Sequence, residues 1–391
     1  MKRLILRQGH DRRIRQGHPW IFSNEIGHIE GSPQGGDAVE IYSHSGAAYG
    51  TAYYNPHSLI SARLLSHGQV AIDEVDFFRT RIKAAADYRR ALYPDAQAAR
   101  LVHGEGDGLP GLVVDRYGDI LSVQFLTLGI DCRKELICKA LIELFQPSAI
   151  VARNDVGIRA LEGLPQHTEI LSGAPPEMTV IHEHGLRYRI NVLRGQKTGH
   201  FLDQKENHLT LENRVAGRRV LDLFCYSGGW ATHAARFGAI EVLGVDISAD
   251  AIALARENAR LNYQETVCRF ETADAFEMLR TLKSAGERFG LITLDPPAFV
   301  KSKKKLAEAT RGYLTINRRA MELVEPGGYL ITCSCSYHMQ RDLFLDMLRQ
   351  AASQAGRAVR LLEMRGQAYD HPVLLACPET DYLKCAVLQI V

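Results

Sequence analysis

Two cysteines lie at the end of a single apolar segment, where a thiol could act as a nucleophile. Residues 328–336 read GYLITCSCS, and alternation along a strand places Cys333 and Cys335 on the same face. Carbon 5 of a pyrimidine is not nucleophilic by itself, but addition of a thiolate to carbon 6 makes it so. A strand cysteine usually only packs in the core, which is the interpretation we favour for Cys333. Cys335, at the mouth of the strand, is the candidate nucleophile.

Asp295 is the second residue that could take part in a reaction. It follows an apolar run, residues 290–294, and precedes two prolines that favour an extended loop directly after the strand. This placement aims its carboxylate at a bound cofactor and at any base beside it. Enzymes that methylate exocyclic amines have an aromatic residue directly after such prolines, whereas here Ala298 intervenes before Phe299. An isolated loop of this kind is also typical of an ordinary turn.

The elements that must position these side chains begin with residues 220–246, VLDLFCYSGGWATHAARFGAIEVLGVD. The apolar runs and the glycine turn predict strand, turn, helix and strand, the first unit of a doubly wound α/β sheet. Asp246 ends the second strand, where a carboxylate can accept hydrogen bonds from both ribose hydroxyls. The bulk of Trp230 directly after the glycines disfavours a pyrophosphate and hence NAD. S-adenosylmethionine fits better, and a glycine turn that binds nothing is the alternative.

Other residues of this region are expected to complete the cofactor site. The methionine end can lie beside Asp222 and Tyr226, and Asp274, after a short strand, can accept a hydrogen bond from the adenine amino group. Asp295 is expected to face the sulfonium. Their neighbours in the expected pocket are Ser227, Gly228, Ile247 and Ala275.

Four spaced motifs carry a resemblance to a known family: RGQKTGHFLDQKENH (194–208), YSGG (226–229), DPPAFVKSKK (295–304) and SCS (334–336). Together they resemble the bacterial large-subunit rRNA cytosine-5 methyltransferases of the RlmI type, and the likeness extends along the whole chain. The resemblance implies that Cys335 is the nucleophile and that Phe201 and Gln204 line the cofactor pocket. Many RNA cytosine-5 methyltransferases have a second cysteine, which follows the proline of the loop equivalent to residues 295–297 here. Here Pro297 or Ala298 stands there, so another base must assist product release.

The distribution of basic residues along the sequence bears on which macromolecule the protein binds. The 391 residues carry 47 lysines and arginines against 45 acids, so any nucleic-acid site must be a local patch. Each basic cluster alone is typical of a solvated surface, but their joint presence favours RNA, and neither DNA nor a membrane is expected. The clusters are Lys2, Arg3, Arg7, Arg12, Arg13 and Arg15 near the start, and Lys301, Lys303, Lys304 and Lys305 after the prolines.

The sequence also predicts a cytoplasmic protein. It shows no secretory leader and no apolar run of membrane length. Its eight cysteines and fifteen histidines show no metal-ligand spacing, so reduced thiols and no metal are expected. A homodimer is compatible with the sequence.

Glycine and proline punctuation suggests four parts. Residues 1–72 read as a small closed β unit that resembles a PUA domain, an RNA-binding fold. Residues 73–180 read as an α+β domain, 181–200 as a β-hairpin connector, and 201–391 as the Rossmann-like methyltransferase domain.

The favoured interpretation is an S-adenosylmethionine-dependent enzyme that methylates carbon 5 of a cytosine in 23S rRNA. Methylation of a guanine by a related enzyme, with a purely structural Cys335, is an alternative. A non-catalytic RNA-binding protein with a vestigial cofactor fold is another.

Overall fold

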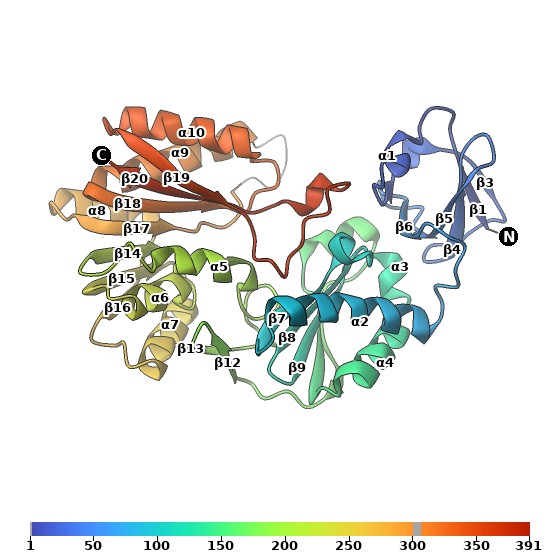
Figure 1. Ribbon diagram of the computed structural model, residues 1–391, viewed down its shortest axis with the longest axis horizontal. Helices are drawn as coiled ribbons and strands as arrows, with labels where there is room; N and C mark the ends of the chain where they lie inside the picture. Colours follow the sequence, from blue (N-terminus) through green and yellow to red (C-terminus); the bar gives the residue numbers. More distant parts are fainter. Residues whose placement is uncertain (1, 300–305) are drawn as a thin grey trace. The chain divides into compact units, whose positions relative to one another are not determined.

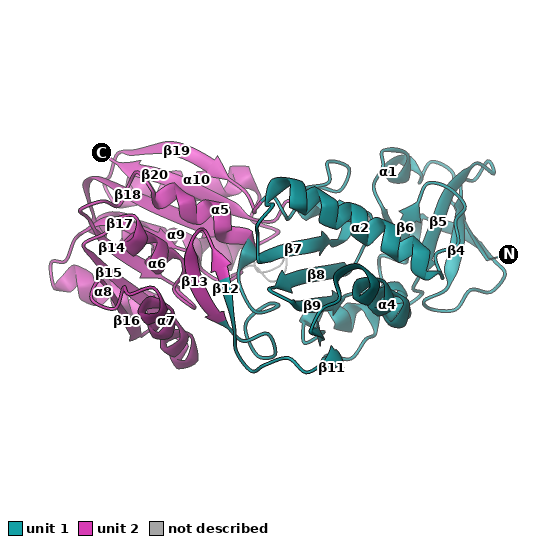
Figure 2. Ribbon diagram, turned by 60° about the horizontal axis from the view of Figure 1, so that its bottom comes forward, with its two compact units in different colours: residues 1–181, 190–202, 369–380 teal, residues 182–189, 203–368, 381–391 magenta. Residues whose placement is uncertain are grey.

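The computed structural model describes residues 2–299 and 306–391. The chain divides into two compact units, coloured teal and magenta in Figure 2. Unit 1 comprises Met1–Ile181, Ile190–Leu202 and Tyr369–Thr380, and unit 2 comprises His182–Arg189, Asp203–Ala368 and Asp381–Val391. This division differs from the four predicted ranges, because the segments 190–202 and 369–380 have most of their contacts with unit 1. No helix in the part of the chain described here is long and apolar enough to cross a membrane.

The first sheet of unit 1 contains six short strands in the order β2-β6-β5-β4-β1-β3. All neighbours are antiparallel except β1 and β4. The pairing leaves β2 and β3 at the edges, where the sequence suggested a closed unit. The strands are β1 (Arg3–Leu6), β2 (Trp20–Ile21), β3 (Ile26–Glu30), β4 (Ala38–Tyr42), β5 (Ala48–Tyr54) and β6 (Ala62–Ser66), with the helical turn α1 (Arg12–Arg15) between β1 and β2.

The second sheet of unit 1 has five strands in the order β11-β10-β9-β8-β7. Its core is shared with helices α2 (Val75–Leu92) and α4 (Lys134–Phe145), which bury Phe78, Ile82 and Ile137 against it. The strands are β7 (Ala98–His103), β8 (Leu112–Tyr117), β9 (Ile120–Phe125), β10 (Ala149–Arg153) and β11 (Thr168–Gly173), and a short helix α3 (Leu128–Asp131) follows β9. The mixture of helices and strands agrees with the α+β character predicted for residues 73–180.

A two-stranded sheet, β12 (Thr179–Glu183) and β13 (Leu186–Ile190), forms the predicted hairpin. His184 and Gly185 make its turn with positive φ values of 48° and 77°. Glycine adopts such a conformation without strain.

Unit 2 is a doubly wound α/β sheet of seven strands in the order β16-β15-β14-β17-β18-β20-β19 (Figure 1). The first five are parallel, and β20 is antiparallel to both of its neighbours. The strands are β14 (Arg219–Leu223), β15 (Glu241–Asp246), β16 (Cys268–Thr272), β17 (Phe289–Leu294), β18 (Val324–Ser334), β19 (Val359–Arg365) and β20 (Lys384–Ile390).

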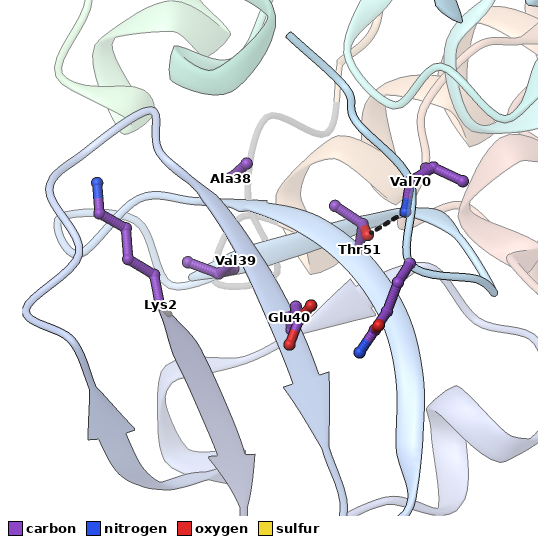
Figure 3. Close-up of a pocket in the computed structure, with 7 residues that line it drawn as sticks. Lys2, Ala38, Val39, Glu40, Thr51 and Val70 are labelled. Carbon is purple, nitrogen blue, oxygen red and sulfur yellow. Dashed lines mark hydrogen bonds between the residues drawn. The ribbon is translucent and has the colours of Figure 1, made fainter.

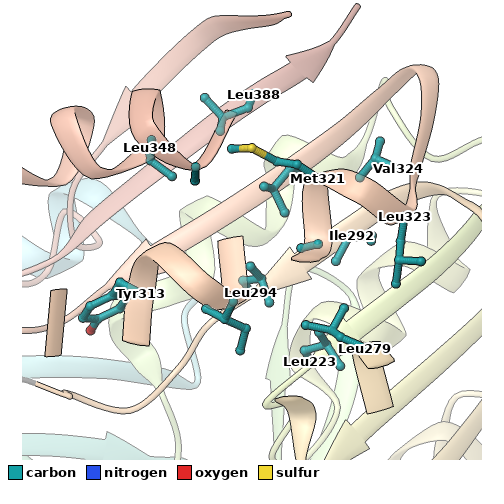
Figure 4. Close-up of a cluster of buried hydrophobic side chains, with 14 of the residues drawn as sticks. Leu223, Leu279, Ile292, Leu294, Tyr313, Met321, Leu323, Val324, Leu348 and Leu388 are labelled. Atoms are coloured by element: carbon teal, nitrogen blue, oxygen red, sulfur yellow. The ribbon is translucent and has the colours of Figure 1, made fainter. Parts of the chain in front are cut away.

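Helices cover both faces of this sheet, and each face has its own apolar core. One core joins the sheet to α8 (Ala275–Ser284), α9 (Leu306–Leu323) and α10 (Arg341–Gln354), and Figure 4 shows part of it. The other joins the sheet to α6 (Gly229–Arg236) and α7 (Ala249–Leu261). The short helix α5 (Lys205–His208) precedes β14. The chain order reverses direction across the sheet between β14 and β17, the point at which such folds bind ligands.

Residues 326–328 lie inside β18, which begins at Val324. The register between β17 and β18 shifts between Phe289 and Leu291, which accommodates these residues as an irregularity within the ladder.

Candidate functional site

The predicted chemical residues meet at one edge of the unit 2 sheet. Asp246 ends β15, Asp222 lies near the end of β14, Asp295 follows β17 and Cys335 follows β18. These four parallel strands are neighbours in the sheet. Their carboxyl ends therefore share one edge, and the four side chains come from four adjacent strands.

The glycine turn after β14 is fixed by Asp246. One carboxylate oxygen of Asp246 accepts a hydrogen bond from the Tyr226 backbone N–H at 3.0 Å, and the other accepts one from Ser248 N–H at 2.9 Å. Ser227 is held by Asn258, whose Nδ2 donates to its carbonyl at 3.0 Å. Gly228 caps α6 with φ +85°, a left-handed conformation that favours glycine. A carboxylate oxygen can accept more than one hydrogen bond, so Asp246 retains capacity for hydroxyl donors.

Asp222 is a fully buried carboxyl group. The Thr293 hydroxyl donates to Oδ1 at 2.7 Å, and the Ala231 N–H donates to Oδ2 at 3.1 Å. Burial raises the pKa of Asp222 from 3.8 to about 7, and the nearby carboxylates of Asp295 and Asp246 add to this rise. Asp246 and Asp295 thus place negative charge beside Asp222, whose buried carboxyl group keeps its proton up to about pH 7. A cofactor with a sulfonium and an ammonium group fits this set of acceptors, and the expected ribose acceptor, Asp246, is part of it.

Asp295 is oriented by two donors from other elements. Gln204 Nε2 donates to Oδ2 at 2.9 Å, and the indole N–H of Trp230 points to the same oxygen at 3.4 Å. Gln204 is itself fixed by Asn207, whose Nδ2 donates to Gln204 Oε1 at 2.7 Å. The sequence assigned Gln204 to the pocket only by resemblance. It treated Trp230 only as bulk, because nothing in the chain order reveals that its indole reaches Asp295.

The two cysteines differ in environment. Cys333 is fully buried beside Cys385, and burial together with that neighbour holds the pKa of its thiol well above the ordinary value. Cys335 is half-buried directly after β18, and its Sγ lies 3.9 Å from the carbonyl oxygen of Pro296. The thiol of Cys335 therefore lies against the loop that carries Asp295, whereas Cys333 is a core residue.

Polar contacts hold the chain around Cys335. The Tyr313 hydroxyl, from α9, lies 3.1 Å from Ser334 Oγ and 3.0 Å from Ser336 Oγ. Lys384, the first residue of β20, donates from Nζ to the Ser336 carbonyl at 2.8 Å. Neither Tyr313 nor Lys384 was found from the sequence, because both come from elements distant in the chain.

The remaining predicted cofactor contacts are less defined. Ile247 is 73% exposed directly after β15. Asp274 caps α8, where its Oδ1 accepts the Glu277 N–H at 3.0 Å, and Ala275 is buried in the first turn of that helix. Phe201 belongs to unit 1, where the ammonium of Lys197 lies 4.4 Å from its ring centroid. The roles of these four residues stay predictions.

The N-terminal basic cluster is more neutralised than its sequence suggests. Salt bridges inside unit 1 join Lys2 to Asp37, Arg3 to Glu30 and Glu40, Arg13 to Glu379, and Arg15 to Asp11. Arg7 and Arg12 remain exposed. The second basic cluster, Lys301 and Lys303 to Lys305, lies outside the described residues.

A cavity of about 380 Å³ lies over the first sheet of unit 1 (Figure 3). Its polar lining includes Lys2, Glu40 and Thr51, and Thr51 Oγ1 accepts the Val70 N–H at 3.1 Å. None of the predicted catalytic or cofactor residues lines it.

Two groups of side chains among the described residues bring metal-ligating atoms within 4.8 Å of one another: His18, Cys377 and Glu379, and Glu183, His208 and His233. In the first group, Arg13 Nη2 lies 2.7 Å from His18 Nε2 and 3.3 Å from Glu379, so a guanidinium already supplies the positive charge. In the second, His208 Nδ1 and Glu183 Oε1 are 3.0 Å apart and hydrogen-bond to each other. Sequence spacing could not reveal either group, because His18 is far in the chain from Cys377 and Glu379, and Glu183, His208 and His233 are widely separated.

Two family models match this chain, each over a different range of residues. A family model described as an S-adenosylmethionine-dependent methyltransferase matches residues 100–369, and a PUA-like domain model matches residues 4–67. The ribosomal RNA large subunit methyltransferase I of Aeromonas hydrophila is 40% identical over 391 residues, which cover 99% of this chain and 98% of the relative. Its counterpart in Erwinia tasmaniensis is 39% identical over 386 residues, covering 98% of each chain. A solved methyltransferase structure complexed with SAH has a TM-score of 0.87 at 21% identity and covers all of both chains, which is a likeness of fold.

Proposed function

Since this chain belongs to the ribosomal RNA large subunit methyltransferase I family of S-adenosylmethionine-dependent methyltransferases, we propose that it methylates carbon 5 of a cytosine in 23S rRNA. S-adenosylmethionine is its cofactor. The ribosomal RNA named for the relatives supplies the substrate class, and the cysteine at the strand end supplies the choice of atom.

The observation that carries the proposal is the position of the Cys335 thiol against the Asp295 loop. A thiol beside the cofactor edge is unnecessary for methylating an exocyclic amine, whose nitrogen is already nucleophilic. It is required at pyrimidine carbon 5, where a covalent bond to carbon 6 must first raise the electron density. Phe299 supports this assignment. Ala298 separates it from the prolines, and its ring packs on Tyr313 with centroids 4.7 Å apart.

Each residue has a defined task in the reaction. The Cys335 thiolate adds to carbon 6, while Asp295 hydrogen-bonds ring nitrogen 3 and supplies the proton that balances the developing charge. When bound, S-adenosylmethionine supplies an electrophilic methyl group on a sulfonium. Once carbon 5 has taken the methyl group, a base removes the proton from carbon 5, the carbon 6–sulfur bond breaks so that Cys335 leaves as the thiolate, and nitrogen 3 returns its proton to Asp295. The target base must be unstacked to reach the site.

The cofactor assignment follows the strand ends. Asp246 accepts from the ribose hydroxyls, the turn of Tyr226, Ser227 and Gly228 lies against the cofactor, and Asp222 and Asp295 face its positive groups. Ile247, Asp274 and Ala275 border the adenine, and Phe201 and Gln204 complete the pocket.

RNA is the macromolecular partner. The PUA-like residues 4–67 support RNA contacts outside the methyltransferase fold. The exposed Arg7 and Arg12 supply positive charge in this domain. A 23S rRNA substrate places the protein in the cytoplasm.

Mapping of modified nucleosides in 23S rRNA tests this function. Cells lacking the protein should lose one 5-methylcytidine, and the purified protein with S-adenosylmethionine should restore it on the isolated RNA or ribosomal subunit. Loss of a methylated guanine instead would contradict the proposal and leave Cys335 a structural residue.

A further inference from the structure

Lys384 is a buried cation whose presence needs an explanation. Its side chain is 5% exposed at the start of β20. Among the described residues, no carboxylate forms an ion pair with its ammonium. Lysines are almost never buried without such a partner, because desolvating an uncompensated charge is costly. Lys384 is therefore a candidate for a functional group.

Lys384 contacts the residues on either side of Cys335. Nζ donates to the Ser336 carbonyl and to the Tyr382 carbonyl, both at 2.8 Å. In the antiparallel ladder of β18 and β20, Lys384 lies opposite Ser334. The amine thus joins the segment that leaves β18 to the segment that enters β20. Cys335 lies between the paired residue, Ser334, and the bonded residue, Ser336.

The electrostatic environment connects Lys384 with the thiol. Burial lowers the pKa of Lys384 to about 8, while the charges of Asp381 and of the Cys335 thiolate act in the opposite direction. Such an interaction is reciprocal, so a protonated Lys384 favours the thiolate of Cys335. Four other titratable groups lie nearby: Tyr313 on α9, Cys333 and Cys385 in the ladder, and Asp295 after β17.

We propose that Lys384 is the positioning residue for Cys335, holding the chain after β18 with its hydrogen bonds and favouring the thiolate with its positive charge. This role rests on the proposed function of Cys335 as the nucleophile. The amine does not contact the substrate in this account. It acts through the Cys335 thiol, whose position it fixes and whose ionised form it favours.

The test is the pH dependence of Cys335 alkylation by iodoacetamide in the full-length, cofactor-free protein, followed by peptide mass spectrometry. Lys384→Met removes the charge and should move the midpoint of the Cys335 curve upward by about one pH unit, the size expected for one nearby opposite charge. Lys384→Arg keeps the charge and should return the midpoint to that of the wild type. The exposed Cys132 serves as an internal control, and its curve should not move. Lys283→Met, which changes an exposed lysine paired with Glu322, is the matched control variant.

A purely structural Lys384 would leave the Cys335 midpoint unchanged in Lys384→Met, and this result would overturn the proposal. If that variant does not fold, as judged by circular dichroism, the exposed Asp381→Asn decides instead. Loss of Asp381 weakens protonation of Lys384 and should slow Cys335 alkylation at neutral pH, and an unchanged rate would again overturn the proposal. Alkylation needs no RNA, so a failure here is distinct from a failure of cytosine-5 methylation, which product analysis reports.

Discussion

The buried carboxyl group of Asp222 should make the protein less stable as the pH rises. Its folded-state pKa is raised to about 7, whereas the unfolded chain has a value near 3.8. Below pH 4 both states hold the proton, so the group costs nothing. Between pH 4 and 7 the unfolded chain releases the proton and the folded protein keeps it, which lowers the free energy of unfolding by about 1.4 kcal/mol per pH unit. Above pH 7 the loss is complete, at about 4 kcal/mol.

Asp222→Asn removes this titration with little change of shape. The amide oxygen can accept the Ala231 N–H, and the amide nitrogen can donate to the Thr293 hydroxyl. The measurement is urea denaturation of the cofactor-free wild type and variant from pH 4 to 9, taking the difference between them at each pH so that other titrating groups cancel. The variant should gain about 3 kcal/mol relative to the wild type between pH 5 and 7, and nothing more above pH 8.

The matched control is Asp250→Asn, an exposed carboxylate in the first turn of α7. Its difference from the wild type should be constant from pH 5 to 9. If the Asp222→Asn difference is equally constant, the reasoning about the buried carboxyl group is wrong.

Three other perturbations address the cofactor, the RNA and the catalytic carboxylate. Asp246→Ala should weaken S-adenosylmethionine binding by about 10-fold to 100-fold in calorimetry, because hydrogen bonds to a charged group contribute roughly 1.5–3 kcal/mol; unchanged affinity would exclude Asp246 as the ribose acceptor. The double variant Arg7→Glu and Arg12→Glu should lower rRNA affinity and reduce its logarithmic salt slope by about two, with cofactor affinity unchanged, and an unaltered slope would show that these arginines do not contact phosphates. Gln204→Leu should lower kcat by about tenfold through misorientation of Asp295 and should also weaken S-adenosylmethionine binding, because Gln204 is proposed to line the cofactor pocket; an unchanged kcat would contradict the role of Gln204 in orienting Asp295.

The doubly wound fold and the order of the site were predictable from local signals. Apolar runs define β14, β15, β17 and β18, and the glycine turn and the prolines mark two of their ends. Because parallel strands present their carboxyl ends at one edge, Asp222, Asp246 and Asp295 could be placed together without knowing the structure. The distinction between Cys333 and Cys335 followed from distance along the strand, and the burial of the two residues agrees with it.

The unpredicted features depend on contacts between distant segments. Lys384 lies beside Cys335 only because β20 inserts antiparallel between β18 and β19, and no local pattern specifies that pairing. The indole of Trp230, on α6 after β14, reaches Asp295, which follows β17 in the same unit. The ion pairs of Arg3 and Arg13 likewise use acids from elsewhere in unit 1, so a cluster of basic letters overstated the free positive charge.

Covalent trapping on 5-fluorocytosine tests the central claim most directly. Fluorine at carbon 5 blocks the final proton removal, so wild-type protein incubated with S-adenosylmethionine and substituted RNA should form an adduct that survives denaturation and maps to Cys335. Cys333→Ala should still form the adduct, and Cys335→Ala should form none while retaining cofactor affinity. An active Cys335→Ala protein, or an adduct that maps to Cys333, would contradict the account.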